Sequence, residues 1–486
     1  MDGICVLDIG TTNIKLSIFT REGEILWQSK VKTPYALGNS SKVEIIPSKV
    51  LKAVLKMLYS NPKKNIPGRI RAIVIIGMAS SMVPVNKNGE AVSNCICWND
   101  RRNSEVCLEI DLTPIKNRLR QYPMPMYLPY RLKWYERNMP QVLANTTKWL
   151  NITNYIAFQL SDSGLFYTDY SQASRTFLFD IPNAKWDVQV AEFFGIDITR
   201  LPEPIPSASI IGKLRKEFIS DPVYQDCMIV IGGHDHMCAL LASGVNDSNA
   251  ILNSTGTSEA LVCPVPPNLS FPYVEAYCNL EYQVLENKFA LVGYTTSTGK
   301  IFEWANERYR LFSHEKTMDI EKLTVNKRPI FVPPERHILP QFKGGFEGLE
   351  SEFTEEDLSY SVLEGTVMES KVLLETMMHY TGIKPKLIRV VGGLARMRNY
   401  LKLKATVLGI PIEAIEDVDM ATLGGYILGE IALGNNIGVS TILKEVWKWQ
   451  KSERVEPDNS TQQYFGERFN EYKERRSAYD KDIDSR

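Results

Sequence analysis

Two short turns rich in Gly, Thr and Ser stand at matching places in the two halves of this sequence. The first runs from Asp8 to Thr12 (DIGTT), and an altered copy from Ser254 to Ser258 (STGTS) lies about halfway along the chain. Each turn stands between two apolar runs, which predicts the tight bend of a β-hairpin. Glycine lets a phosphate approach the backbone, and the hydroxyls add donors beside the exposed amides. Two such hairpins that face each other across a cleft can grip a nucleotide triphosphate.

The residues after the first turn alternate in the manner of a strand, with Ile14, Leu16 and Ile18 separated by polar side chains. A polar turn follows, and a third strand begins at Ile25. A meander of this kind is similar to the opening of the ribonuclease-H-like fold of actin, hexokinase and Hsp70. One Gly-Thr turn alone is as typical of an ordinary bend, so it is the second copy that favours phosphate binding.

The length of 486 residues favours two domains over a single core, and two domains imply a cleft. The best boundary lies between Gly244 and Ser248, after a predicted helix and before the second turn. We therefore predict an α/β fold with two ribonuclease-H-like domains, residues 1–246 and 247–486, flanking a catalytic cleft.

The composition excludes several classes of protein. A formal net charge of -1 supplies no field to attract nucleic acid. No segment is continuously apolar over the roughly 20 residues needed to span a bilayer, and the start of the chain has no secretory signal pattern. The eight cysteines are scattered without CxxC pairs, which favours reduced thiols. We expect a cytoplasmic protein that binds neither membrane nor nucleic acid.

Asp235 is the strongest candidate for chemistry. A buried strand over 229–231 is expected to end in Gly-Gly-His-Asp-His, with a helix beginning near Met237. Reactive groups of α/β proteins gather at such carboxyl ends of strands. Three roles are open for this carboxylate: general base toward a substrate hydroxyl, N-cap of the helix, or metal ligand together with His234 and His236. Convergence of three adjacent residues on one ion is awkward.

A second carboxylate, Asp8, lies in the first phosphate turn, where it can hold Mg²⁺ directly or through water. The alternative is a cap of the turn itself. After Trp98, the side chains of Asp100 and Arg102 can hold several hydroxyls of a polyol, but the same segment also fits a helix N-terminus capped by Asn99 or Asp100.

Two pairs of glycines in the second half stand at predicted helix starts, Gly392-Gly393 after a predicted strand and Gly424-Gly425 in a predicted helix. They permit close approach of a flat ligand or a phosphate and suggest a nucleoside pocket, although such pairs are as common in packing. The segment 293–300 resembles a P-loop but fails its spacing.

Taken together, the motifs resemble the FGGY carbohydrate kinases, the family of glycerol kinase, xylulokinase, gluconokinase and L-fuculokinase. The resemblance covers nearly the whole chain and rests on landmarks in the family's order: Asp8 to Thr12, Gly77 to Met82, Trp98 to Arg102, Lys133-Trp134 with Asn138 and Pro140, Thr168 to Ser171, Gly232 to Asp235, Thr255 to Ser258, Gly392-Gly393 and Leu423-Gly424.

The resemblance implies an ATP- and Mg²⁺-dependent kinase whose acceptor is a sugar, polyol or sugar acid. It implies that the N-terminal domain binds the sugar and carries the base Asp235, that the C-terminal domain binds the nucleotide, and that Asp8 lies near Mg²⁺. The substrate residues would be Ser81, Met82, Asp100, Arg101 and His236. The nucleotide residues would be Gly10, Thr11, Thr12, Lys15, Gly256, Thr257, Gly299, Gly392, Gly393 and Gly424.

The chain departs from the family pattern at several places, among them the segment 297–304, which lacks the usual paired glycine, and His236 after the base. Leu394, Met397 and Lys402 stand in the nucleotide helix region where the family usually has small residues and Gln, and Ser80-Ser81-Met82 lacks the Gln-Met-His of xylulokinases. D-Xylulose is therefore not favoured as acceptor. Two other functions are considered, a catalytically degenerate family member and a nucleotide switch of the actin or Hsp70 kind. A homodimer is a further expectation.

Overall fold

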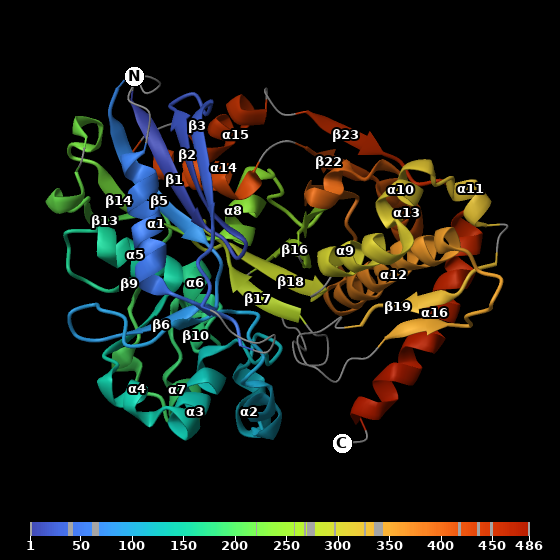
Figure 1. The fold of residues 1–486 in the computed structure, drawn as a ribbon, viewed down its shortest axis with the longest axis horizontal. Coiled ribbons are helices and arrows are strands. Elements are labelled where there is room, and N and C mark those ends of the chain that lie inside the picture. The colour runs from blue at the N-terminus through green and yellow to red at the C-terminus, as the bar shows by residue number, and fades with distance from the viewer. Residues whose placement is uncertain are drawn as a thin grey trace.

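The computed structural model describes residues 2–36, 42–60, 68–219, 221–256, 258–266, 269, 278–295, 298–324, 327–334, 344–416, 419–434, 438–447 and 451–484. Two large sheets dominate it (Figure 1). The first has the order β13 (Ser209–Lys213), β14 (Met228–His234), β5 (Ile70–Gly77), β1 (Gly3–Ile9), β2 (Asn13–Thr20) and β3 (Ile25–Lys32). The second has the order β17 (Cys278–Tyr282), β18 (Phe289–Thr295), β16 (Glu259–Val265), β15 (Ala250–Thr255), β21 (Leu387–Gly392), β22 (Ile412–Ile415) and β23 (Ser452–Val455).

The two sheets repeat one strand arrangement. In each, a first strand (β1 or β15) pairs antiparallel with its hairpin partner and parallel with a later strand (β5 or β21). A second parallel strand follows (β14 or β22), and an antiparallel strand (β13 or β23) closes that edge. The predicted hairpins at both phosphate turns are confirmed, and so are two α/β halves with related topology.

Burial explains why these segments form strands. β1 is buried along its whole length and β5 at all but one residue, so both read as nearly continuous apolar runs. Parallel strands covered on both faces need that composition. In contrast, β3 alternates between exposed and partly covered residues, as befits an edge strand.

The segment 129–160 is mostly helical but contains one strand. It forms α3 (Leu128–Asn138), α4 (Pro140–Asn145), β8 (Lys148–Asn151) and α5 (Ile152–Leu160). The strand arises because 148–151 pair with β6 (Met82–Val85) in a smaller sheet that also holds β4 (Glu44–Ile45) and β7 (Cys95–Ile96). Pairing with a strand distant in sequence overrides local helix preference.

Helices cover the second sheet and close the chain. α9 (Thr298–Tyr309), α12 (Glu355–Thr381), α13 (Arg398–Leu408) and the final α16 (Gln462–Asp484) belong to this part. One face of α16 is apolar, and its residues Phe465, Phe469 and Tyr472 are buried in the core of the second half. None of the helices in the described ranges combines the length and apolar character needed to cross a bilayer.

Two helices join the halves. α8 (Asp235–Ala242) leaves the first sheet and leads toward the second, whereas α14 (Met420–Ala432) comes from the second half but packs against α8, β1 and β5. One hydrophobic cluster therefore contains both Val6 and Leu423. The crossing of α8 and α14 is close because a Cβ at Gly424 would lie 2.0 Å from the carbonyl oxygen of Cys238.

This crossing predicts opposite effects of two Gly→Ala changes. Gly424→Ala forces the helices apart, and overpacking of this kind costs about 1–3 kcal/mol of unfolding free energy. Gly466→Ala in α16 meets nothing within 4 Å and should stabilise by about 0.5–1 kcal/mol through helix propensity. Denaturant unfolding of both variants measures the two effects. Equal stability of Gly424→Ala and the parent would contradict a tight crossing.

Candidate active site

A cavity of about 200 Å³ lies between the two sheets. Side chains of the first half line one side, among them Thr11, Met78, Trp98, Arg175 and the three residues 234–236. The turn of the second half lines the other side with Ser254, Thr255, Gly256 and Ser258, and Tyr294 of β18 joins them. The cavity thus brings together the two turns that the sequence placed far apart.

Asp235 is the first residue of α8, directly after β14, as the sequence predicted for the strand-to-helix junction. His234, not Asp235, occupies the N-cap position, so the cap alternative is not supported. The Oδ1 atom of Asp235 accepts a hydrogen bond from the His236 amide at 2.8 Å, and the side chain keeps 29% exposure toward the cavity. Burial raises its pKa, but His236, His234 and that amide bond outweigh burial and hold it below its usual range. Asp235 is therefore an ionised carboxylate that faces a ligand space.

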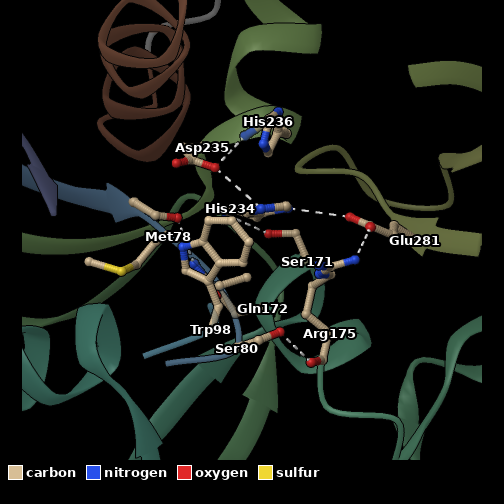
Figure 2. A network of polar contacts seen from close by, with 12 residues as sticks. Met78, Ser80, Trp98, Ser171, Gln172, Arg175, His234, Asp235, His236 and Glu281 are labelled. Carbon is tan, nitrogen blue, oxygen red and sulfur yellow. Dashed lines mark hydrogen bonds and ion pairs between the residues drawn. The ribbon is translucent and has the colours of Figure 1, made fainter. Parts of the chain in front are cut away.

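Three polar side chains connect Asp235 to the second sheet (Figure 2). His234 Nε2 lies 3.2 Å from Asp235 Oδ1, and His234 Nδ1 lies 3.3 Å from Glu281 Oε2. Arg175 Nη1 donates to Glu281 Oε1 at 2.6 Å. We call Arg175, Glu281, His234 and Asp235 the cross-sheet ion-pair network. Burial raises the pKa of Glu281, but Arg175 and His234 bring it to about 2, so this carboxylate is ionised as well.

The metal alternative for 234–236 is weakened by this network. The candidate ligand atoms of the three residues lie within 4.8 Å of one another. Both ring nitrogens of His234 already face carboxylate oxygens, however, and the backbone amide of His236 already bonds Asp235. Within the described residues, His234 Nδ1, His236 Nδ1 and Glu281 Oε2 are nevertheless buried without a hydrogen-bond partner.

Asp8 lies at the end of β1 beside two further charges. Lys15 Nζ is 3.5 Å from Asp8 Oδ2 and 2.5 Å from Oδ2 of Asp419, the N-cap residue of α14. Burial raises the pKa of Asp8 to about 8 against the opposing charge of Lys15, and Asp419 and Asp235 add to the rise. The Asp8 Oδ1 atom is buried with no hydrogen-bond partner in the described part of the chain. The site therefore holds three carboxylates, of Asp8, Asp419 and Asp235, and one lysine. Carboxylate oxygens suit a hard divalent cation, and Asp8 Oδ1 is available to bind one.

The first phosphate turn is held by its neighbours. The Gly10 amide donates to the Asn13 carbonyl oxygen at 3.1 Å, which closes the turn. Trp98 Nε1 donates to Thr11 Oγ1 at 2.9 Å, and the Tyr35 hydroxyl donates to the Thr11 carbonyl oxygen at 2.7 Å. Thr12 is exposed beside them. The turn is therefore rigid on its protein side and open toward the cavity.

A second cavity of about 470 Å³ lies against the second sheet. Gly299, Lys300, Phe302, Phe312, Gly393, Leu394, Arg396 and Met397 are among its lining residues. Gly256 lines both cavities, and a Cβ there would have only one neighbouring atom at 4.0 Å. An extended ligand can thus lie with one end in each cavity and its middle against the Gly256 backbone.

Several predicted site residues lie elsewhere than in the two cavities. Asp100 is fully buried and binds Arg102 through both oxygens and the Val43 amide, and Ser81 and Met82 lie behind Trp98. Arg101 is half-buried in the adjoining loop. Gly392, with φ of +95°, abuts the Thr255 carbonyl, where a Cβ would lie at 1.9 Å. It supports the second turn, as Gly424 supports the helix crossing. Thr257 lies outside the described residues.

The cavity also contains residues that sequence reasoning missed as ligands. Met124, Met126, Arg175 and Tyr294 line it, and Glu281 lies behind them. Glu281 carried a readable signal, because it is the one charged residue of β17, a short strand that is buried along its whole length. The methionines and Arg175 carried none, since they lie in loops and a short helix end whose placement depends on the whole domain.

The domain models of a known family match this chain. The N-terminal domain of the FGGY family of carbohydrate kinases matches residues 4–242, and the C-terminal domain of that family matches residues 252–433. The chain belongs to the FGGY family of carbohydrate kinases. It is accordingly a phosphotransferase whose acceptor is an alcohol group, which confirms the family and the enzyme class predicted from its motifs.

Relatives of this FGGY kinase match it over nearly its whole length, in sequence and in fold. It is 25% identical to glycerol kinase 2 of Saccharolobus solfataricus over 470 residues, which cover 92% of each chain. Its fold is similar to that of the ligand-bound xylulose kinase of Lactobacillus acidophilus, with a TM-score of 0.87, 21% identity and 98% of each chain covered. It is also similar to glycerol kinase of Plasmodium falciparum with ADP, with a TM-score of 0.86, 18% identity and 98% coverage of each.

The raised pKa of Asp8 predicts that this carboxylate destabilises the protein. Above about pH 4 the unfolded chain has lost this proton, while the folded chain keeps it up to about pH 8. The free energy of unfolding therefore decreases steadily as the pH rises from 4 to 8, because only the unfolded chain ionises readily in this range. Asp8→Asn should raise the melting temperature of the protein without nucleotide or Mg²⁺ by a few degrees at pH 8 and by less at pH 5. A difference in melting temperature between Asp8→Asn and the parent that is the same at pH 5 and pH 8 would contradict the raised pKa of Asp8.

Proposed function

We propose that this FGGY kinase transfers the γ-phosphate of ATP to a hydroxyl of a sugar, polyol or sugar acid, with Asp235 as general base. The observation that carries the proposal is a single cavity that holds both an ionised Asp235 and the backbone of Gly256. A proton acceptor and a phosphate-binding turn then meet at one place, with a second cavity adjoining for the rest of the nucleotide.

In the proposed reaction Asp235 accepts the proton of the attacking hydroxyl. The acceptor oxygen forms a bond to the γ-phosphorus while the bond from that phosphorus to the bridging oxygen breaks, and ADP leaves. Phosphoryl transfer depends mainly on positioning and charge neutralisation. The turns at Gly10 and Gly256 would position the phosphates, and Lys15 beside the first turn would neutralise part of their charge. Asp235 and Asp419 stand at helix N-termini, where backbone amides favour an anion.

Mg²⁺ would be held near Asp8, whose free buried oxygen and excess of neighbouring carboxylates suit it. When bound, the ion neutralises phosphate charge. Lys15 would oppose the rise in the pKa of Asp8 by its charge and orient the carboxylate by its contact. The predictions of a cytoplasmic enzyme and of a homodimer belong to the same proposal.

The acceptor is a polyhydroxy compound, which glycerol kinase and xylulose kinase among the relatives support by name. The acceptor side of the cavity is lined by Met78, Met124, Met126 and the Trp98 ring, which suit C–H surfaces. Arg175 and residues 234–236 line the same cavity and offer polar groups. The hydroxyl to be phosphorylated would lie beside Asp235.

Replacement of the base tests the mechanism. Asp235→Asn keeps the shape of the side chain but removes the proton acceptor, so kcat should fall roughly 10²- to 10⁴-fold with the KM for ATP nearly unchanged. Full turnover by this variant on the best acceptor would refute the role of Asp235.

A panel of polyols, ketoses and aldonates, with ADP release as the readout, tests the acceptor. Glycerol, D-xylulose and D-gluconate represent the three classes, and we expect acceptor-dependent release with at least one member. ADP binding by calorimetry accompanies the panel. No binding and no turnover would favour a catalytically degenerate member of the family, and slow release independent of acceptor would favour a nucleotide switch.

A further inference from the structure

Arg175 is the one arginine or lysine among the described residues that line the cavity between the two sheets. It follows α6 (Tyr170–Ser174) directly, and its guanidinium reaches toward Glu281 of β17 (Figure 2). The residue is 5% exposed. Because a buried charge interacts strongly with its surroundings, the partners of Arg175 determine which charge a ligand of this cavity can carry.

Glu281 cancels the charge of Arg175. Arg175 Nη1 donates to Glu281 Oε1 at 2.6 Å, and the Tyr294 hydroxyl donates to the same oxygen at 2.9 Å. Glu281 is inaccessible to solvent, so water screens the attraction between the two charges very little. The pair is neutral as a whole. The described lining of the cavity therefore holds no arginine or lysine charge that is left over for an anionic acceptor.

The guanidinium of Arg175 is also held in one orientation. Its central carbon lies 5.1 Å from the centroid of the Tyr294 ring and 5.8 Å from that of the Tyr127 ring, within the range of cation–π contacts. The Arg175 carbonyl oxygen accepts a hydrogen bond from the Ser80 hydroxyl at 2.9 Å, which fixes the backbone at this point. A carboxylate that entered the cavity would have to compete with Glu281 for a cation that is already in place.

Arg175 nevertheless keeps donors for a neutral ligand. Its Nη2 points to Met126 Sδ at 3.8 Å, and a thioether sulfur is a weak acceptor. Its Nε is buried with no hydrogen-bond partner in the part of the chain that the structure describes. Arg175 and Met126 both line the cavity. The hydroxyl oxygen of an acceptor can therefore replace the sulfur at Nη2, and this contact needs no charge on the ligand.

The rest of the acceptor side opposes a carboxylate. Met78, Met124 and the Trp98 ring line it, and an anion against such groups loses its water without a replacement. The polar residues 234–236 include the carboxylate of Asp235, which lies 3.2 Å from the ring of its neighbour in the sequence. Any acidic group bound beside these residues would face that carboxylate at short range.

We propose that the Arg175–Glu281 pair makes the acceptor site selective for uncharged polyhydroxy compounds and excludes sugar acids. Arg175 donates to a hydroxyl of the acceptor through Nη2, and Glu281 cancels the charge that would otherwise attract a carboxylate. The proposal rests on the proposed function of this cavity as the acceptor site, and it narrows the acceptor to sugars and polyols. Selectivity then combines an attractive contact with one ligand and the repulsion of another.

Matched pairs of acceptors test the selection in the parent enzyme. Glycerol with D-glycerate, xylitol with D-xylonate and sorbitol with D-gluconate differ only where a CH₂OH group is replaced by a carboxylate. With Mg-ATP, the kcat/KM of the neutral member should exceed that of the acid by about 100-fold or more, since like charges placed together at a binding site are strongly unfavourable. An acid within about tenfold of its neutral partner overturns the proposal, because such a ratio is too small for charge repulsion.

Binding separates this proposal from the proposed function. Calorimetric titration of each pair into the full chain with ADP and Mg²⁺ measures the selection without turnover. Binding of the neutral members alone, with no phosphorylation of any acceptor, refutes phosphoryl transfer and leaves the selection standing. Full activity of Asp235→Asn likewise refutes the base and not the selection. Acids that bind as tightly as their neutral partners, or the absence of binding by both members of every pair, overturn the selection.

Glu281→Gln tests the pair itself. It keeps the shape of the side chain and an acceptor oxygen for Arg175, but it leaves the guanidinium charge unbalanced. The ratio of kcat/KM between neutral and acid acceptors should therefore fall roughly tenfold or more, through faster reaction of the acid. An unchanged ratio in a folded Glu281→Gln protein overturns the proposal. The matched pairs in the parent remain decisive if this variant fails to fold.

The double variant of Arg175→Gln and Glu281→Gln removes both charges. It should raise the ratio again toward that of the parent, because the cation that attracts the acid is gone. A double variant with the same ratio as Glu281→Gln alone overturns the proposal, since the gain of the acid would then not come from Arg175.

Glu364→Gln is the matched control. Glu364 is a buried carboxylate that pairs with Arg328 at 3.1 Å, and neither residue is among the described lining of the two cavities. This variant should keep the ratio of the parent. A fall in the ratio equal to that of Glu281→Gln overturns the proposal, because it would show a general effect of the loss of a buried ion pair.

Discussion

The close crossing of α8 and α14 governs the geometry of this enzyme. These helices share apolar contacts with both large sheets, and the missing side chain of Gly424 lets their backbones touch. The N-termini of the two helices carry Asp235 and Asp419. A change in the crossing would therefore move the candidate base and the partner of Lys15 together, and with them the charge balance around Asp8.

The site has an unequal distribution of charge that fits its chemistry. Near Asp8 three carboxylates meet one lysine, so the charge is unbalanced and the pKa of Asp8 is raised to about 8 by burial and its neighbours. Around Asp235 the two histidines and the His236 amide outweigh burial, and this carboxylate stays ionised. Asp8 thus shares one lysine with two other carboxylates, whereas Asp235 is held below its usual pKa, and this difference favours a metal role for the first and a base role for the second.

Much of the fold could be predicted from the sequence because its signals are local. The Gly-Thr turns, the alternation over 14–18 and the apolar run before Asp235 report backbone preference and burial within a few residues. The strand at Lys148–Asn151 could not be predicted, since it owes its form to pairing with β6, more than 60 residues earlier. Gly424 was expected at the nucleotide, but it serves packing, and spacing alone does not separate the two uses.

The sequence by itself determined the family, the two related halves and the identity of the candidate base, because each rests on residue types at short, ordered spacings. The tertiary structure decided which of these residues share a cavity. It enclosed Asp100 with Arg102 and Val43, and it brought Arg175 and Glu281, 106 residues apart, into contact beside His234. Such contacts depend on how two separate sheets meet, and no local pattern in the chain encodes that meeting.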